Sequence, residues 1–134
     1  MSNAHFLEKI KNDFPEFRFI SDKKFAFRPP RTIVIGPEEN QFESLLLHEL
    51  GHAVLGHKDF KIDAERLKME AAAWEKAHEI AEKYGIPINE DFVQDELDTY
   101  RDWLHTKSRC KKCGLTRYQT HDGTYHCPRC ENFS

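Results

Sequence analysis

All four cysteines of the chain lie between residues 110 and 130, as the pairs Cys110-x-x-Cys113 and Cys127-x-x-Cys130. Each pair forms a turn that aims two thiolates at one point, and such pairs 13 residues apart are typical of a tetrahedral zinc site. The intervening sequence has a hairpin signal, His121-Asp122-Gly123. We therefore expect a β-rich zinc ribbon over residues 107–134, folded by its metal because so short a segment cannot build a sufficient core.

A redox dithiol is the alternative for these cysteines. One thiol pair would suffice for disulfide exchange, and no redox fold surrounds the two pairs. No basic-then-apolar leader opens the chain, and no apolar run approaches the roughly 20 residues of a membrane span. The cysteines are therefore interpreted as zinc ligands in a reducing compartment, which predicts a cytoplasmic location without a membrane partner.

The rest of the chain differs from this tail in charge. Residues 1–104 hold 14 Lys and Arg against 21 Asp and Glu, whereas residues 105–134 hold 6 against 2. Hydrophobic residues make up 39% of the chain and charged residues 32%, which is typical of a soluble globular protein. The change of sign places a domain boundary near residues 105–108, between a body at 5–104 and the ribbon at 107–134.

Hydrophobic periodicity predicts an α+β body. Three strands are expected, of which the first two form a hairpin, and the last, Thr32 to Ile35, is expected to be an edge that pairs with an extended substrate. Asn40 is the expected cap of a helix ending at Leu55. The expected strands are 17–20, 25–27 and 32–35, and the expected helices are 5–14, 41–55, 63–84 and 90–104.

The helix after the last strand contains His48-Glu49-Leu50-Gly51-His52. Histidines four residues apart lie on one helical face, so both imidazoles can reach one Zn²⁺ while Glu49 sits beside them to take a proton from water. The periodicity predicts that the leucines of this helix pack inward and that its histidines line a cleft. The pattern indicates a catalytic zinc site with Glu49 as general base.

The next helix supplies a carboxylate in an otherwise apolar stripe. Its three-four repeat consists of Leu67, Glu70, Trp74, Ala77, Ala81 and Tyr84. A lone charge in a buried stripe lowers the stability of the fold by roughly several kcal/mol unless the charge is paired or bound to metal. Glu70 is therefore the expected third zinc ligand, whereas Glu75 belongs to the solvated face.

These residues resemble the IrrE/ImmA family of small zinc metallopeptidases, in which a HExxH helix precedes a helix containing Glu-Ala. The match rests on His48-Glu-Leu-Gly-His52 and Glu70-Ala71, and it covers about residues 25 to 84. It implies a zincin-like domain with His48, His52 and Glu70 as zinc ligands and Glu49 as general base. It also implies a protein substrate, for which a transcriptional repressor is one candidate.

Two alternatives stay open. The SprT-like proteases, which are DNA-associated and would use the basic ribbon to bind nucleic acid, also combine HExxH with a zinc ribbon. They use a further downstream histidine, for which this chain offers only His57 and His78. A non-catalytic adaptor stabilised by two zinc ions is the other. A purely structural site has no use for a carboxylate such as Glu49 beside the metal, which favours a peptidase with one catalytic and one structural zinc.

The ribbon carries a second functional prediction. Its cations suit contacts with phosphate groups, and Tyr118 and Tyr125 suit base stacking. The acidic helix 90–104 is an alternative, intramolecular partner that would mask these cations. The cations are Lys107, Arg109, Lys111, Lys112, Arg117 and Arg129.

Overall fold

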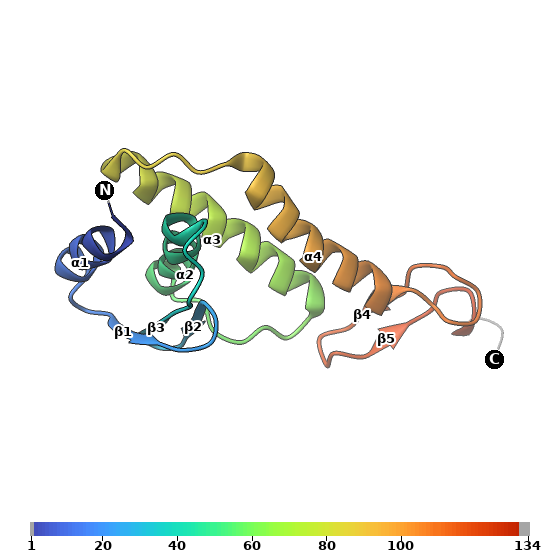
Figure 1. The fold of residues 1–134 in the computed structure, drawn as a ribbon. Helices are drawn as coiled ribbons and strands as arrows, with labels where there is room; N and C mark the ends of the chain where they lie inside the picture. The colour runs from blue at the N-terminus through green and yellow to red at the C-terminus, as the bar shows by residue number, and fades with distance from the viewer. Residues whose placement is uncertain (1, 132–134) are drawn as a thin grey trace. The chain divides into compact units, whose positions relative to one another are not determined.

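The computed structural model describes residues 2–131, and the elements it contains are α-helices and short β-strands (Figure 1). The α+β class is thus confirmed. In chain order the elements are α1 (Asn3–Asp13), β1 (Arg18–Ser21), β2 (Ala26–Arg28), β3 (Thr32–Ile35), α2 (Phe42–Leu55), α3 (Asp63–Tyr84), α4 (Glu90–Ser108), β4 (Tyr118–Gln119) and β5 (Tyr125–His126).

The three-stranded sheet has the order β1-β3-β2. β3 pairs in parallel with β1, with Phe19 opposite Ile33, and antiparallel with β2, with Phe27 opposite the same Ile33. The predicted hairpin between β1 and β2 is therefore wrong, because β3 lies between them. The predicted edge is wrong for the same reason: β3 has strands on both sides, and β1 and β2 are the edges.

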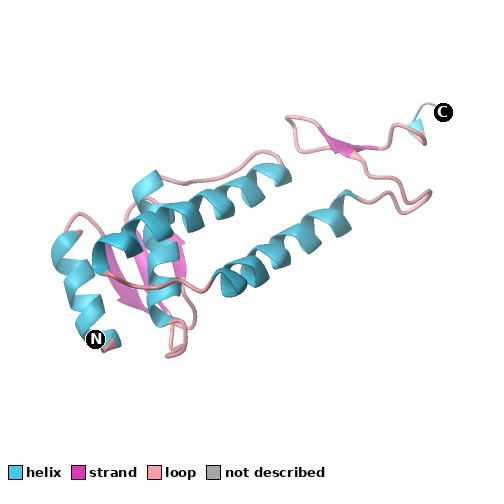
Figure 2. Ribbon diagram, turned by 90° about the horizontal axis from the view of Figure 1, so that it is seen from above, coloured by secondary structure: helices cyan, strands magenta, loops and turns pink. Residues whose placement is uncertain are grey.

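α2 packs against β2 and β3, and Figure 2 shows it crossing the sheet. The β-branched side chains Ile33 and Val34 and the helix residues Leu46, Leu47 and Leu50 are all at most 1% exposed. Burial of large aliphatic side chains contributes about 1.5–3 kcal/mol each, so this layer forms the core that holds α2 in place.

The helix boundaries show which local signals operate. α3 spans Asp63–Tyr84 as predicted, and Gly85 follows it in the left-handed conformation at φ 66°. Asn40 does not cap α2: the N-cap is Gln41, at φ 61° and without a side-chain cap bond. α4 continues to Ser108, one turn past the predicted end. The N–H of Arg109 still donates a helical hydrogen bond to His105 O at 3.1 Å.

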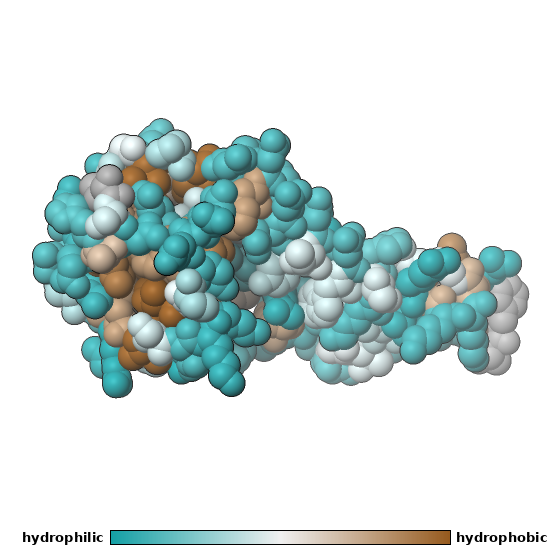
Figure 3. Space-filling model, viewed as in Figure 1, coloured by the Kyte–Doolittle hydropathy of each residue, from teal (hydrophilic) through white to brown (hydrophobic). Residues whose placement is uncertain are grey.

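The chain divides into two compact units, one comprising the residues up to 58 with 71–89 and the other 59–70 with 90 onward. The first holds the sheet, α1, α2 and most of α3. The second groups the ribbon with α4 and the first turns of α3, whereas the sequence placed the ribbon by itself from residue 107. On the face shown in Figure 3, hydrophobic residues gather over the unit that holds the sheet. In the described part of the chain, every helix is too short or too polar to cross a bilayer.

Candidate metal centres

The first candidate centre is on α2, which is buried on all sides over its central two turns. Every residue from Leu46 to Ala53 is buried. His48 and His52 are only 8% and 7% exposed, whereas Val54, which the periodicity assigned to the packed face, is 38% exposed. The burial of α2 therefore does not separate a packed leucine face from an open histidine face, because both histidines are nearly as buried as the leucines.

Gly51 explains how a second helix covers this part of α2. A Cβ atom at residue 51 would clash with the carbonyl oxygen of Ala73 on α3. The glycine of the motif therefore permits the close approach of two helix backbones, and the small side chains of α3 at this level serve the same end. The close approach places α3 directly against the helix that carries the histidines.

His48 receives its orientation from that contact. Its imidazole lies flat on the indole of Trp74, with ring centroids 4.3 Å apart and planes 4° apart. Trp74 is 2% exposed and is one of the largest fully buried side chains. One face of the His48 ring is therefore covered by a side chain that itself has no room to move.

The structure brings His48, Glu49 and His52 together. One potential ligand atom of each lies within 4.8 Å of the others, and the two imidazole centroids are 4.7 Å apart. Glu49 is 7% exposed, and its Oε2 lies 3.9 Å from His48 Nδ1. Imidazole nitrogens are donors that zinc prefers, so His48 and His52 fit this metal, and Glu70 is not among the residues whose ligand atoms converge here.

His57 belongs to this site, although the sequence places it in a solvated loop after the helix. Its Nδ1 lies 2.8 Å from His52 Nδ1, and the ring centroids are 5.1 Å apart. The signal that could have identified it is Gly56, because a glycine after a helix reverses the chain direction and returns the next side chain toward the last turn.

Glu70 is buried, as the stripe of α3 predicts. It is 8% exposed, and it precedes Trp74 by one helical turn. Glu75 is exposed, also as predicted. A buried carboxylate needs compensation, and metal ligation would supply it, so the role of Glu70 as third ligand stays a prediction that its burial supports.

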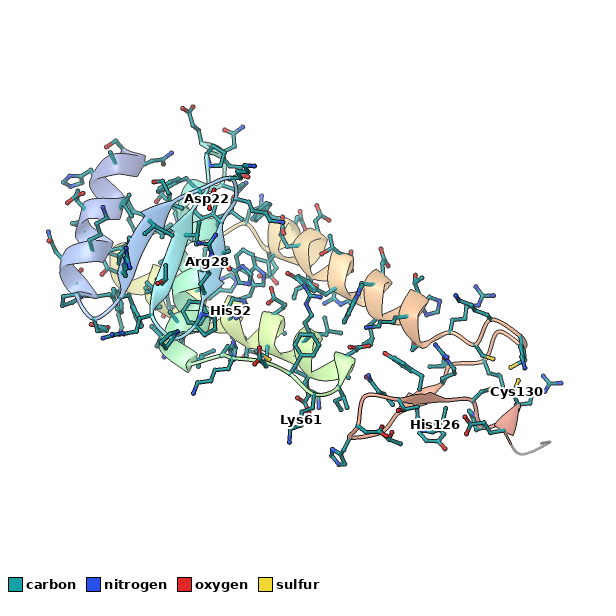
Figure 4. The ribbon with its side chains drawn as sticks, turned by 90° about the horizontal axis from the view of Figure 1, so that it is seen from below. Asp22, Arg28, His52, Lys61, His126 and Cys130 are labelled. Carbon is teal, nitrogen blue, oxygen red and sulfur yellow. The ribbon has the colours of Figure 1, made fainter. Side chains whose placement is uncertain are left out.

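The second candidate centre is the cysteine cluster, whose four sulfur atoms lie within 4.8 Å of one another. Cys110 Sγ lies 3.8 Å from Cys130 Sγ, and Cys113 Sγ lies 3.5 Å from Cys127 Sγ. Zn–S bonds of about 2.3 Å in a tetrahedron separate the sulfurs by about 3.8 Å, so the cluster fits zinc. Figure 4 shows the sulfur atoms around Cys130 at the end of the ribbon.

The backbone of the ribbon prepares these thiols for a cation. Hydrogen bonds from the N–H groups of Cys113 and Lys112 lower the pKa of Cys110 to about 6. The pKa of Cys127 is also lowered, chiefly by a hydrogen bond from the N–H of Cys130. Hydrogen bonds with the neighbouring thiols raise the pKa of Cys130 to about 12. Two sulfurs are thus favoured as thiolates, and the last proton leaves when a metal binds.

The ribbon is attached to the start of α3 by Asp63, which is 4% exposed. Its carboxylate accepts a hydrogen bond from the Tyr125 hydroxyl at 2.6 Å and pairs with Lys107 Nζ at 3.1 Å, and its backbone N–H donates to Gln119 Oε1 at 2.6 Å. From sequence alone, no role is expected for Asp63 beyond the start of the helix. Burial and the bond to Asp63 raise the pKa of Tyr125 to about 12.

Both the hydroxyl and the ring of Tyr84, the last residue of α3, contact α1. Its hydroxyl donates to Asp13, and its ring meets Phe6 edge-on at 5.8 Å. Burial and this hydrogen bond raise the pKa of Tyr84 to about 12. Tyr84 therefore joins α3 to α1.

Comparison with known proteins does not assign this chain to a family, so the interpretation of its function rests on its own residues. No family model matches the chain, and no curated protein or solved structure matches it significantly.

Proposed function

We propose that the chain is a zinc-dependent metallopeptidase with a zincin-like catalytic domain, acting on a protein substrate in the cytoplasm. The observation that carries this proposal is the joint burial of His48, Glu49 and His52 with their ligand atoms within 4.8 Å. A structural site gains nothing from a buried carboxylate next to two imidazoles, whereas a hydrolase needs a base there.

His48, His52 and Glu70 would hold the catalytic zinc, and the four cysteines would hold a structural one. When bound, the catalytic zinc polarises the scissile carbonyl and acidifies water. Glu49 takes the proton of the attacking water and passes it to the leaving amine. Trp74 would orient the His48 ring by stacking on it, with their planes 4° apart.

An extended substrate would pair with β2 in this account, in place of the predicted β3. β2 is the edge strand that packs against α2, so its unpaired backbone groups belong to a strand in contact with the helix that carries the histidines. A transcriptional repressor, implied by the resemblance to the IrrE/ImmA family, is one protein class that would present such a segment.

A non-catalytic zinc-stabilised adaptor is the second candidate. The burial of His48 and His52, which are 8% and 7% exposed, favours it, because a structural zinc site is closed to water. The two candidates make opposite predictions for Glu49, since only the peptidase uses its carboxylate.

The deciding experiment compares Glu49→Gln with Glu70→Gln in the full chain. Hydrolysis of casein and of a fluorescence-quenched peptide library is measured together with zinc content. Glu49→Gln should keep both zinc ions and lose about 100-fold or more of the hydrolysis rate. Glu70→Gln should lose the catalytic zinc and the activity together, because a neutral amide replaces an anionic ligand.

Glu75→Gln is the matched control, because Glu75 lies on the exposed face of the same helix. It should change neither zinc content nor rate. Loss of zinc in Glu75→Gln with retention in Glu70→Gln would show that the third ligand is misassigned. An unchanged hydrolysis rate in Glu49→Gln would overturn the peptidase mechanism.

A further inference from the structure

Two adjoining cavities of about 630 and 480 Å³ lie in the second unit, between the last turns of α4 and the ribbon. Both are lined by Thr106, Arg109 and Lys111, so they form one continuous groove. We call it the α4–ribbon groove. It lies away from the histidine site in sequence, and the proposed peptidase reaction does not use it.

The lining of the α4–ribbon groove is strongly basic. Asp102 is its only acidic side chain apart from the cysteines. A zinc ion with four thiolates adds two negative charges, so the cations remain in excess. The cationic residues that line the groove are Lys107, Arg109, Lys111, Lys112 and Arg117.

Two of these cations form a fixed frame. Arg117 Nη2 donates to Lys107 O at 2.7 Å, and its guanidinium lies 4.8 Å from the ring centre of Tyr125. Lys107 is held by Asp63. Because both are tied to their surroundings, the groove keeps its shape without a ligand, which lowers the entropic cost of binding.

The other three cations are available to a ligand. Arg109, Lys111 and Lys112 are exposed, and across residues 2–131 their charged groups take part in no ion pair. The acidic side of α4 does not mask them: its Asp98 pairs with Arg101 on the same helix at 2.7 Å. The intramolecular masking that the sequence suggested is therefore not seen in the described residues.

We propose that the α4–ribbon groove binds the phosphodiester backbone of nucleic acid without reading its bases. The aromatic side chains are occupied: Tyr125 binds Asp63, and the ring of Trp103 carries Arg66 at 4.9 Å and Lys107 at 5.1 Å. Tyr118 stacks on His126, with ring centroids 5.4 Å apart, and is not among the residues that line the groove. Phosphate contacts need only charge, which Arg109, Lys111 and Lys112 supply at this groove.

The test uses the zinc-loaded full chain and labelled oligonucleotides, single-stranded and duplex, of two unrelated sequences. Binding is followed by fluorescence anisotropy over a range of salt concentrations. Arg109→Ala/Lys111→Ala/Lys112→Ala should weaken binding at least tenfold at low salt. It should also make the slope of log K against log salt shallower by about 2 for single strands, since each phosphate contact contributes about 0.7.

Lys9→Ala/Lys23→Ala/Lys24→Ala is the matched control, because it removes the same charge from exposed positions of the first unit. It should leave the affinity within about twofold. Equal losses in the two triple variants would overturn the proposal, because they would show attraction by net charge alone. A strong preference for one sequence, or binding of polyglutamate as tightly as the oligonucleotide, would overturn it as well.

A second inference follows independently from His57, and it rests on the proposed zinc site. Gly56, at φ 69°, ends α2 in a Schellman motif: its N–H donates to Ala53 O at 3.1 Å, and the N–H of His57 donates to His52 O at 3.0 Å. This reversal returns the His57 ring to the last turn. The 2.8 Å contact between the Nδ1 atoms makes one ring the donor and the other the acceptor.

We infer that His57 is a positioning residue for His52. If His52 donates from Nδ1, its Nε2 on the far edge of the ring is deprotonated and is the nitrogen left for a metal. His57 thereby fixes both the tautomer and the orientation of a ligand, as partners of metal-bound histidines commonly do. A nitrogen that faces Nδ1 of His52 is directed away from a metal on Nε2, so the geometry favours a supporting role for His57 over direct ligation.

Zinc affinity at the histidine site, measured by chelator competition with the cysteine site filled, tests this role. His57→Ala should weaken zinc by about 10–100-fold. His57→Asn, whose amide oxygen can stand where Nδ1 stands, should restore most of the affinity. The exposed His5→Ala is the control and should change nothing.

Cobalt substitution separates positioning from ligation. The visible absorption of the cobalt-loaded site in His57→Asn should match that of the wild type. A changed spectrum, like that of His52→Ala, would show that His57 is a ligand, and an unchanged zinc affinity in His57→Ala would also overturn the inference. A wild-type chain without peptidase activity that still shows the His57 effect contradicts the proposed function alone.

Discussion

The imidazole of His48 lies flat on the indole of Trp74, with planes 4° apart and centroids separated by 4.3 Å. The two residues belong to different helices, and their contact is possible because Gly51 lets α3 approach the backbone of α2. The orientation of a proposed metal ligand is thus set by the packing of two helices as well as by the motif that contains it.

Removing the indole of Trp74 should lower the stability of the protein and leave the histidine site less well ordered. Trp74→Ala should lower the free energy of unfolding by about 3–5 kcal/mol, the range for truncating buried aromatic residues. Trp74→Phe keeps a ring under His48 and should cost clearly less. Urea denaturation followed by circular dichroism checks both variants, and a loss below about 1 kcal/mol in Trp74→Ala would contradict the packing described.

Gly51→Ala tests the close approach of the helices. Alanine raises helix propensity by about 1 kcal/mol, but its Cβ would clash with the carbonyl oxygen of Ala73. Because overpacking commonly costs about 1–3 kcal/mol, we expect a net loss of stability together with weaker zinc binding at the histidine site.

Gly85→Ala is the control for this change. Gly85 has φ 66° and nothing within 4 Å of the added Cβ, so the substitution strains the backbone without moving α3 from α2. It should lower stability while leaving zinc affinity unchanged. Equal effects on zinc in the two variants would show that the helix approach does not support the site.

Two half-buried tyrosines, Tyr84 and Tyr125, predict a loss of stability at high pH. Burial raises the pKa of Tyr125 and of Tyr84 to about 12, from an ordinary value near 10. A raised pKa means that the folded state holds a proton which the unfolded state releases. The stability is therefore complete below pH 10 and declines as the pH rises through 12.

Denaturation at pH values from 8 to 12 measures this decline. Tyr125→Phe and Tyr84→Phe should each make the decline shallower, because each removes one group that must stay protonated. Tyr125→Phe should also lower stability at neutral pH by about 1.5–3 kcal/mol, since Asp63 loses a hydrogen bond to its buried carboxylate. Identical pH slopes in the wild type and both variants would contradict the assignment.

Local signals in the sequence were sufficient for much of the fold. Helical periodicity and the stop at Gly85 define α3, and the single charge in its stripe identifies Glu70 as buried. The cysteine spacing likewise indicates the cluster whose sulfurs the structure brings together. In these cases the determining residues are close in sequence.

Strand order and side-chain contacts across turns were not accessible in this way. β3 lies between β1 and β2, and three short strands with similar apolar patterns do not encode that order locally. The burial of His48 depends on Trp74, 26 residues later, and the contact of His57 depends on a left-handed glycine. Periodicity along one helix describes neither.

The zinc content of the purified full chain tests the central claim most directly. Elemental analysis should find two zinc ions per chain in the wild type, one in His48→Ala and one in Cys127→Ser, because the histidine and cysteine sites are built from separate residues. A single zinc ion in the wild type that persists in His48→Ala would contradict the proposed catalytic site.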